Sequence, residues 1–193
     1  SVLCARAGVT TGEWSDVIRS VFGQYRAPTG VSSNQSNRTE GLEELREQVD
    51  LVSAALGRRL KFLVGKPGLD GHSNGAEQIA TRARDCGMDI EYEGIRLTPE
   101  EIVDAAQNGD VHVIGLSILS GSHIPLVRDV MARLTNAGIT HIPVIAGGII
   151  PEDDARELRA MGVAKVYTPK DFELNKIMVD IVTLVDPRSV AAE

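Results

Sequence analysis

Residues 60–75 have the sequence LKFLVGKPGLDGHSNG, an apolar run followed by a polar loop rich in glycine. The run has the length and content of a buried strand. The loop, Gly65–Gly75, is too long and too rich in glycine for a simple connection, which indicates that something approaches its backbone closely. A helical pattern follows, and its small and apolar residues share one face: Ala76, Ile79, Ala80, Ala83 and Cys86. The stretch therefore predicts a strand, a specialised loop and a helix in succession.

This alternation continues to the end of the chain. Strands are predicted at Leu60–Val64, Met88–Tyr92, Val111–Leu116, Ile142–Ala146 and Lys165–Tyr167. Between them, Thr98–Glu101 is a capping box with proline at the first helical position. Further helices are predicted to carry Ile124 to Leu134, to open at Pro151 and to open at Asp171. The pattern predicts an α/β fold, a doubly wound five-stranded parallel sheet with flavodoxin-like strand order, in which ligands bind at the carboxyl ends of the strands.

The first 59 residues differ from the rest, so we expect a mainly helical linker extension over 1–59 and a single domain over 60–193. Thr11 is predicted to cap a short amphipathic helix, and residues 24–39 form a polar, turn-rich linker without periodicity. A helix over Leu42–Leu56 ends at Gly57, which suits a left-handed helix stop. Its apolar face has two candidate partners, the main domain and a neighbour outside this chain.

Composition excludes several classes of protein. The chain has 193 residues, 42% of them hydrophobic and 24% charged, with a net charge of −7. No apolar stretch reaches the roughly 20 residues that span a bilayer, and no basic patch indicates nucleic-acid binding. Cys4 and Cys86 lie far apart and favour reduced thiols in a cytoplasmic protein. The chain starts at Ser1 without a signal-peptide pattern, so we expect a portion of a longer protein.

The loop after the first strand contains an acid and a histidine separated by one glycine. Asp70 can hold one imidazole nitrogen of His72 while the other nitrogen faces a metal. The pair alone is equally compatible with a loop histidine that is hydrogen-bonded to its neighbour. The loop lacks the glycine patterns of dinucleotide and phosphate loops, so nucleotide phosphates are a poor explanation.

Small residues are predicted at the ends of two further strands. Ser117 follows the third strand and Gly147 and Gly148 follow the fourth, so all of them open on the edge where His72 lies. Together they leave a slot for a planar group, with the Ser117 hydroxyl as a hydrogen-bonding partner. Taken singly, a glycine pair at the end of a strand is more often turn chemistry.

The three segments in order, Asp70-x-His72-x-x-Gly75, Ser117-x-Leu119 and Gly147-Gly148, resemble the signature of cobalamin-binding domains in mutases and methionine synthases. The resemblance covers residues 60 to 185. Lys66 also matches the lysine that extends the histidine–aspartate pair in adenosylcobalamin-dependent acyl-CoA mutases. In that family the cofactor's benzimidazole tail leaves the cobalt and is buried in the domain, and a histidine takes its place.

The resemblance assigns a role to each motif residue. It implies that His72 binds the cobalt of adenosylcobalamin, that Asp70 accepts a hydrogen bond from the other ring nitrogen, and that Lys66 pairs with Asp70. The remaining motif residues are implied to surround the cofactor: Gly71 and Gly75 give it room, Ser117 and Leu119 line the tail pocket, and Gly147 and Gly148 border the nucleotide loop.

Longer segments are more similar to ethylmalonyl-CoA mutases than to methylmalonyl-CoA mutases, namely Lys66–Gly75, Ser117–His123 and Tyr167–Asp171. The stretch Ala5–Pro28 resembles the junction between substrate barrel and cobalamin domain in single-chain mutases. The implied activity is that of an isomerase converting ethylmalonyl-CoA to methylsuccinyl-CoA. The acyl-CoA site belongs to the barrel, so the present chain alone is expected to be inactive. Further partners considered are a second copy of the chain and a cobalamin-loading chaperone.

Three alternatives stay open beside this one: a mutase of the methylmalonyl-CoA type, a cobalamin carrier or sensor without catalysis, and a phosphoacceptor domain of the same fold. The last requires an aspartate where Ser117 stands. Among the other histidines, His112 and His141 are expected to be structural, while His123 is a candidate for the cofactor rim. The acidic residues around Asp154 are interpreted as partners of a helix dipole.

Overall fold

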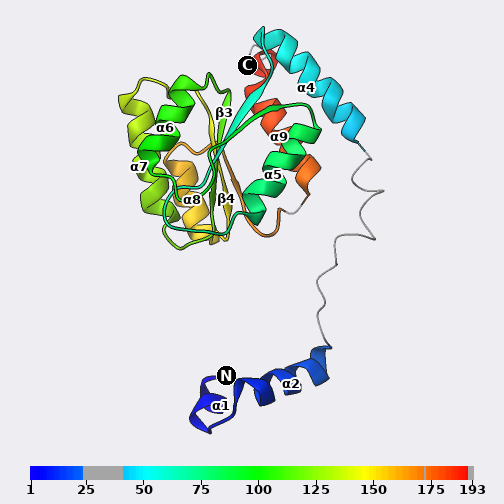
Figure 1. Cartoon of the computed structure of the whole chain (residues 1–193), viewed down its shortest axis with the longest axis vertical. Coiled ribbons are helices and arrows are strands. Elements are labelled where there is room, and N and C mark those ends of the chain that lie inside the picture. Colours follow the sequence, from blue (N-terminus) through cyan, green and yellow to red (C-terminus); the bar gives the residue numbers. More distant parts are fainter. Residues whose placement is uncertain (24–40, 172, 191–193) are drawn as a thin grey trace. The chain divides into compact units, whose positions relative to one another are not determined.

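The computed structural model describes residues 1–23, 41–171 and 173–190 (Figure 1). The chain divides into two compact units, Ser1–Thr39 and Glu40–Glu193. The polar linker predicted over 24–39 lies outside the described residues. The compact sheet-containing unit begins before the helix over Leu42–Leu56, whereas the sequence placed the boundary after residue 59.

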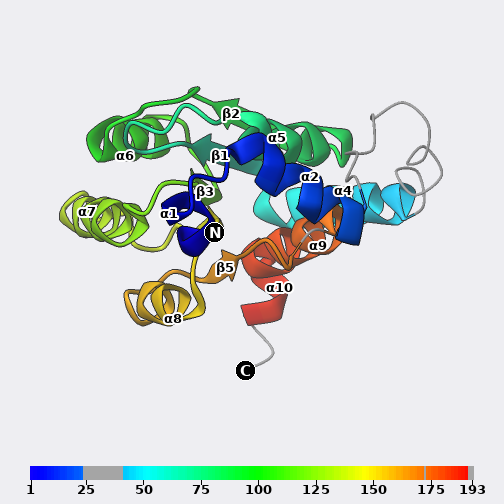
Figure 2. The same ribbon diagram turned by 90° about the horizontal axis from the view of Figure 1, so that it is seen from below.

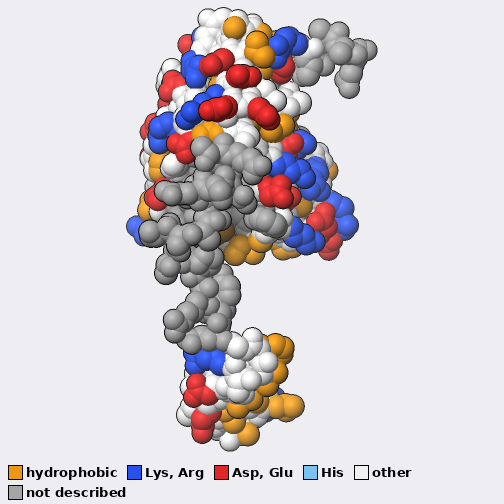
Figure 3. Space-filling view, turned by 90° about the vertical axis from the view of Figure 1, so that its right-hand side faces the viewer, with side chains coloured by type: hydrophobic (Ala, Val, Ile, Leu, Met, Phe, Trp, Pro, Cys, Tyr) orange, Lys and Arg blue, Asp and Glu red, His pale blue; other side chains and the backbone are white. Residues whose placement is uncertain are grey.

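The first unit contains helices α1 (Val2–Arg6) and α2 (Thr11–Phe22). The prediction that Thr11 caps α2 is wrong by one residue, because Thr10 accepts a hydrogen bond from the Glu13 backbone and the Glu13 carboxylate accepts from the Thr10 backbone. Several apolar side chains of this unit are exposed: Val2, Leu3, Val9, Trp14, Val17, Ile18, Val21 and Phe22. Figure 3 shows hydrophobic side chains gathered on one side of the unit.

The second unit is built on a five-stranded sheet with the order β2-β1-β3-β4-β5. Every neighbouring pair is parallel, which confirms the predicted flavodoxin-like topology. The strands are β1 (Lys61–Gly65), β2 (Asp89–Tyr92), β3 (Val113–Ile118), β4 (Val144–Gly148) and β5 (Lys165–Tyr167). The first four begin one or two residues later than predicted, because residues such as Leu60 and Met88 are buried before strand pairing begins.

A helix precedes the first strand of this unit, and further helices connect the strands or follow the last one. They are α4 (Leu42–Leu56), α5 (Asn74–Asp85), α6 (Pro99–Asn108), α7 (His123–Asn136), α8 (Glu152–Ala160), α9 (Leu174–Val185) and α10 (Pro187–Val190). The capping box of Thr98 and Glu101 is confirmed. The predicted helix start at Asp171 is wrong, because the Asp171 carboxylate accepts hydrogen bonds from the Thr168 backbone and hydroxyl and so closes a turn before α9.

The helices cover both faces of the sheet. Helices α6, α7 and α8 lie on one face, and α4, α5 and α9 lie on the other (Figures 1 and 2). Two apolar clusters fill the spaces between these layers. Helix α4 contributes the buried Leu45, Val49 and Val52 to the second cluster, so its partner is the sheet domain. Its end at Gly57, with φ of 73°, confirms the predicted left-handed stop.

Two further properties bear on the sequence predictions. In the described ranges, no helix has both the length and the apolar content needed to cross a membrane. Cys4 and Cys86 are free thiols, and Cys86 is buried. Burial raises the pKa of the Cys86 thiol, so this side chain is a packing residue and not a reactive nucleophile.

Candidate functional site

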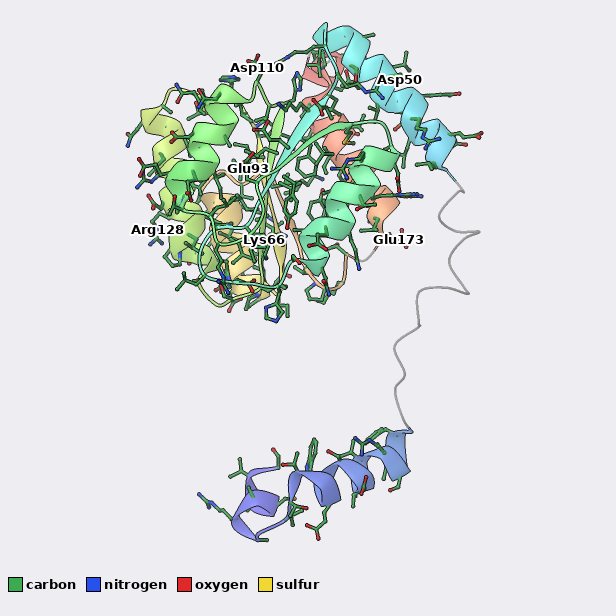
Figure 4. All side chains as sticks on the ribbon, viewed as in Figure 1. Asp50, Lys66, Glu93, Asp110, Arg128 and Glu173 are labelled. Atoms are coloured by element: carbon green, nitrogen blue, oxygen red, sulfur yellow. The ribbon has the colours of Figure 1, made fainter. Side chains whose placement is uncertain are left out.

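The carboxyl ends of β1, β3 and β4 meet at one edge of the sheet. Gly65 pairs with Leu116, Ser117 with Gly147, and Ile118 with Gly148. Ser117 and the two glycines therefore lie inside strands, because the backbone hydrogen-bond ladder continues through these small residues. The sequence had suggested that they follow the strands. Figure 4 shows Lys66 toward this edge, while Asp110, which precedes β3, lies at the opposite edge.

Asp70 is the centre of the site. Its side chain is only 5% exposed. Oδ1 accepts hydrogen bonds from the His72 backbone at 3.0 Å and from His72 Nδ1 at 2.7 Å. Oδ2 accepts from the Leu119 backbone at 3.1 Å and from Lys66 Nζ at 3.3 Å. One carboxylate thus joins the loop after β1 to the loop after β3.

These contacts keep the Asp70 carboxylate charged. Burial alone raises a carboxyl pKa, but the hydrogen bonds from the His72 backbone and ring, the bond from the Leu119 backbone and the charge of Lys66 together hold the pKa of Asp70 well below its ordinary value. An ionised carboxylate is the form that accepts hydrogen bonds on both oxygens. It is therefore a permanent acceptor for the His72 ring.

His72 presents its ring to the outside. The side chain is 82% exposed, although its Nδ1 is held by Asp70. In a neutral imidazole whose Nδ1–H donates to a carboxylate, Nε2 keeps its lone pair. The geometry therefore leaves one oriented, solvent-facing nitrogen that can bind a metal ion.

Lys66 supports Asp70 from inside the domain. Its side chain is fully buried, and besides Asp70 it donates to the Ser117 carbonyl at 3.1 Å. A buried ammonium group requires a close anion because removal from water is costly. Lys66 thereby connects the loop that carries Asp70 and His72 to the end of β3.

A second loop, which the sequence did not single out, braces the His72 loop. The Gly68 backbone donates to the Leu97 carbonyl at 2.8 Å, and the Leu97 backbone donates to the Lys66 carbonyl at 3.0 Å. Arg96 adopts a left-handed φ of 63°, and its guanidinium lies close to the position that a side chain at Gly71 would occupy. Gly94 and the capping box after Leu97 indicate a turn here, but nothing in the sequence pairs it with residues 66–68.

The two glycines of β4 differ in what surrounds them. A Cβ atom on Gly148 would lie 1.8 Å from the Ile118 carbonyl oxygen, whereas one on Gly147 would meet Tyr167 at an ordinary 3.8 Å. Gly148 is therefore required for the close pairing of β3 and β4. Gly147 has room for a Cβ atom at ordinary contact distance from Tyr167. Gly75, which the sequence placed in the loop, lies in the first turn of α5, and nothing lies within 4 Å of a Cβ atom there.

The remaining histidines have assigned partners or lie outside the site. His112 Nδ1 accepts from the Lys61 backbone at 2.9 Å, which confirms a structural role; burial lowers the pKa of its ring. His123, whose place at the cofactor rim the sequence left open, does not lie at an exposed rim, because it is only 2% exposed and its ring lies between the Ser120 carbonyl and Asp154. Asp154 accordingly has a specific partner besides the helix dipole.

The donor set suits a cobalt ion whose other positions are filled by a macrocycle. Within the described ranges, no group of three or more His, Cys, Asp or Glu residues is placed to hold a metal ion. His72 instead offers one oriented nitrogen beside glycines that leave the backbone open. One axial imidazole is the contribution that a protein makes to a metal already bound by a ring. The predicted residues therefore fit a cobalamin.

Comparison with known proteins identifies relatives of the whole chain. A protein named ethylmalonyl-CoA mutase from Cereibacter sphaeroides is 67% identical over 100% of this chain and 29% of its own length. A protein of the same name from Methylorubrum extorquens is 56% identical over 96% of this chain and 27% of its own. A methylmalonyl-CoA mutase large subunit from Propionibacterium freudenreichii is 41% identical over 86% of this chain and 24% of its own. The chain thus spans less than a third of these curated relatives.

Solved structures share the fold. A cobalamin-binding protein from Desulfitobacterium hafniense, 20% identical, has a TM-score of 0.59 over 92% of this chain and 80% of that chain. The monomethylamine corrinoid protein of Methanosarcina barkeri, 17% identical, has a TM-score of 0.55 over 92% of this chain and 87% of that chain. The family model described as the B12 binding domain matches residues 60–171, which contain every residue of the candidate site. The chain belongs to the B12-binding domain family.

Proposed function

We propose that this chain is the cobalamin-binding part of an adenosylcobalamin-dependent acyl-CoA mutase, an isomerase that interconverts ethylmalonyl-CoA and methylsuccinyl-CoA. The observation that carries the cofactor role is the exposed His72 ring, which is oriented by a buried carboxylate through a 2.7 Å contact. The choice of substrate is supported by two relatives, 67% and 56% identical, that carry the name ethylmalonyl-CoA mutase.

In this proposal three residues hold the cobalt end of the cofactor. His72 would hold the cobalt through Nε2. Asp70 fixes the Nδ1–H tautomer and raises the basicity of the ring, as carboxylates do for metal-bound histidines. Lys66 keeps Asp70 in place and balances its charge inside the domain. Lys66 contacts Asp70 and Asp70 contacts His72, so the contacts lead from the interior to the exposed ring. Nε2 of His72 is thereby positioned before any cofactor arrives.

The tail of the cofactor is proposed to enter beside β3 and β4. Ser117 and Leu119 line this tail slot and Gly147 and Gly148 border it from the neighbouring strand, while Gly71 and Gly75 let the corrin ring approach the loop. Ser117 pairs with Gly147 in the sheet, so the residues from the two strands are fixed relative to one another by backbone hydrogen bonds. When bound, adenosylcobalamin supplies the radical chemistry of the rearrangement.

The acyl-CoA substrate is assigned to a barrel domain outside this chain. Residues 5–28 join that barrel to the cobalamin-binding domain in this proposal, and the relatives' greater length is consistent with it. The chain alone therefore binds cofactor without turning over substrate. A second copy of the chain and a cobalamin-loading chaperone belong to the same proposal and rest on the family resemblance, while a cytoplasmic location is supported by the two free thiols of Cys4 and Cys86.

The test is an assay of the natural full-length protein with adenosylcobalamin and either ethylmalonyl-CoA or methylmalonyl-CoA. We expect conversion of ethylmalonyl-CoA, together with cobalamin binding but no conversion by the 193-residue chain. Preference for methylmalonyl-CoA would overturn the substrate assignment. Cobalamin binding without conversion of any acyl-CoA would favour the carrier or sensor alternative, and failure to bind cobalamin would refute the proposal as a whole.

A further inference from the structure

A buried histidine pairs with a partly exposed carboxylate next to the loop that follows β3. His123 is the first residue of α7 and is only 2% exposed. Its Nε2 lies 2.5 Å from Oδ2 of Asp154, which belongs to the first turn of α8. Its Nδ1 lies 3.2 Å from the Ser120 carbonyl oxygen. The ring therefore connects the segments that leave β3 and β4, the two strands that carry the proposed tail slot.

Both ring nitrogens face oxygen atoms that accept hydrogen bonds. The two nitrogens lie at hydrogen-bonding distance from oxygens on different segments, so the ring bridges them. The Asp154 side chain is 37% exposed, so the contact runs from a buried ring to a partly exposed carboxylate.

The position favours this pairing. Asp154 lies in the first turn of α8, where the helix dipole favours a carboxylate. The His123 ring at the start of α7 is buried, and a buried polar group without a hydrogen-bond partner is destabilising. The contact therefore holds the start of α7 against the start of α8.

The pair completes a continuous chain of contacts across the site. Asp70 accepts from the Leu119 backbone at 3.1 Å, and His123 faces the carbonyl of the next residue, Ser120, at 3.2 Å. The loop is thus held from the side of His72 at one residue and from the side of Asp154 at the following one. We infer that His123 and Asp154 form a clasp that positions the tail slot for the nucleotide tail of cobalamin.

This inference rests on the proposed function, because it requires a cobalamin whose tail enters the slot. His123 is a positioning residue that acts through Ser120 and α8. Loss of the clasp should therefore weaken the binding of cobalamin. It should leave the binding of cobinamide unchanged, because cobinamide lacks the nucleotide tail and depends on His72 alone.

The test compares Asp154→Ala with Asp153→Ala in the 193-residue chain. Asp153 is the matched control, because it lies in the same turn but its side chain is 84% exposed and forms an ion pair with Arg156. We expect Asp154→Ala to weaken cobalamin binding about tenfold, a typical cost of losing an orienting partner, and to leave cobinamide binding unchanged. Asp153→Ala should change neither.

The other possible results contradict either the clasp or the proposed function. Equal losses for both corrinoids in a folded Asp154→Ala variant, or no loss for either, would overturn the clasp while leaving the proposed function standing. A wild-type chain that binds neither corrinoid would refute the proposed function and the clasp with it. Should Asp154→Ala not fold, Asp154→Asn keeps the side-chain volume and removes the charge, and it should show the same selective loss.

Discussion

Oδ1 of Asp70 lies 2.7 Å from Nδ1 of His72, so a side chain that is 5% exposed orients one that is 82% exposed. The exposed ring has little packing to fix it, and its direction depends on this one hydrogen bond and the backbone bond beside it. The carboxylate in turn is fixed by the Leu119 backbone and by Lys66. The sheet thus fixes the orientation of the solvent-facing Nε2 of His72 through this series of hydrogen bonds.

Replacing His72 by alanine should remove the axial nitrogen with little damage to the fold. Because the side chain is largely exposed, we expect the free energy of unfolding to fall by about 1.5 kcal/mol or less, the value of one hydrogen bond. Cobalamin binding should weaken by about 10-fold or more. Electron paramagnetic resonance of the bound Co(II) form, with nitrogen-15 histidine, should show coupling to a protein nitrogen that the variant lacks. Unchanged coupling in the variant would exclude His72 as the ligand.

Replacing Asp70 by asparagine should affect both binding and stability. Cobalamin affinity is expected to fall about 10- to 100-fold, because the ring loses its orienting carboxylate. The free energy of unfolding should also fall by about 3 to 5 kcal/mol, because Lys66 becomes a buried charge without its partner. Chemical denaturation and titration with cobalamin measure the two effects separately.

The double variant Lys66→Met/Asp70→Asn separates these roles. Removing the buried ammonium should restore much of the lost stability, since an apolar side chain of similar length needs no anion. It should not restore cobalamin affinity, because His72 still lacks an ionised acceptor. Recovery of both properties would show that Asp70 serves stability alone.

Acid should remove the contribution that the Asp70 carboxylate makes to the free energy of unfolding. Its pKa is depressed in the folded protein, so its ionised form stabilises the fold above the ordinary carboxyl pKa of about 3.9, and this contribution is lost as the pH falls below that value toward the depressed one. The difference in unfolding free energy between wild type and Asp70→Asn should therefore be largest near neutral pH and should narrow below about pH 4. A difference that stays constant down to about pH 2 would contradict the assignment.

The two glycines of β4 should respond differently to substitution. Gly148→Ala should destabilise the domain by about 1 to 3 kcal/mol or more, because its Cβ atom would overlap the Ile118 carbonyl. Gly147→Ala should be tolerated. Gly147→Leu should project into the tail slot and weaken the binding of cobalamin much more than that of cobinamide. Calorimetric titration with the two corrinoids measures this difference, and equal losses would place Gly147 outside the slot.

The fold was predictable because its signals are local and repeated. Apolar runs, helical spacing and capping boxes such as that of Thr98 and Glu101 are properties of neighbouring residues, and together they specified the strands and the order of the sheet. The errors concern ends of elements. Ser117 and Gly147 were placed after their strands, because small residues carry little strand propensity, whereas backbone pairing with the adjacent strand extends through them.

The candidate site was predictable in its residues but not in its connections. The separation of Asp70 and His72 by a single residue indicated their contact, and the resemblance to acyl-CoA mutases added Lys66. The bond from the Leu119 backbone to Asp70 joins residues 49 positions apart, and the contact of His123 with Asp154 joins residues 31 positions apart. Such contacts depend on how strands and helices pack, and single-sequence patterns do not contain that information.

The buried ammonium of Lys66 has a consequence for how this segment can change in length. Lys66 reaches Asp70 four residues later and Ser117 on β3, and both ends of the intervening turn are thereby fixed, with Gly68 bonded to Leu97 between them. An inserted or deleted residue would move the carboxylate away from the charge it neutralises. Side chains such as the exposed Leu69 can be exchanged freely, whereas the number of residues from Lys66 to His72 cannot vary.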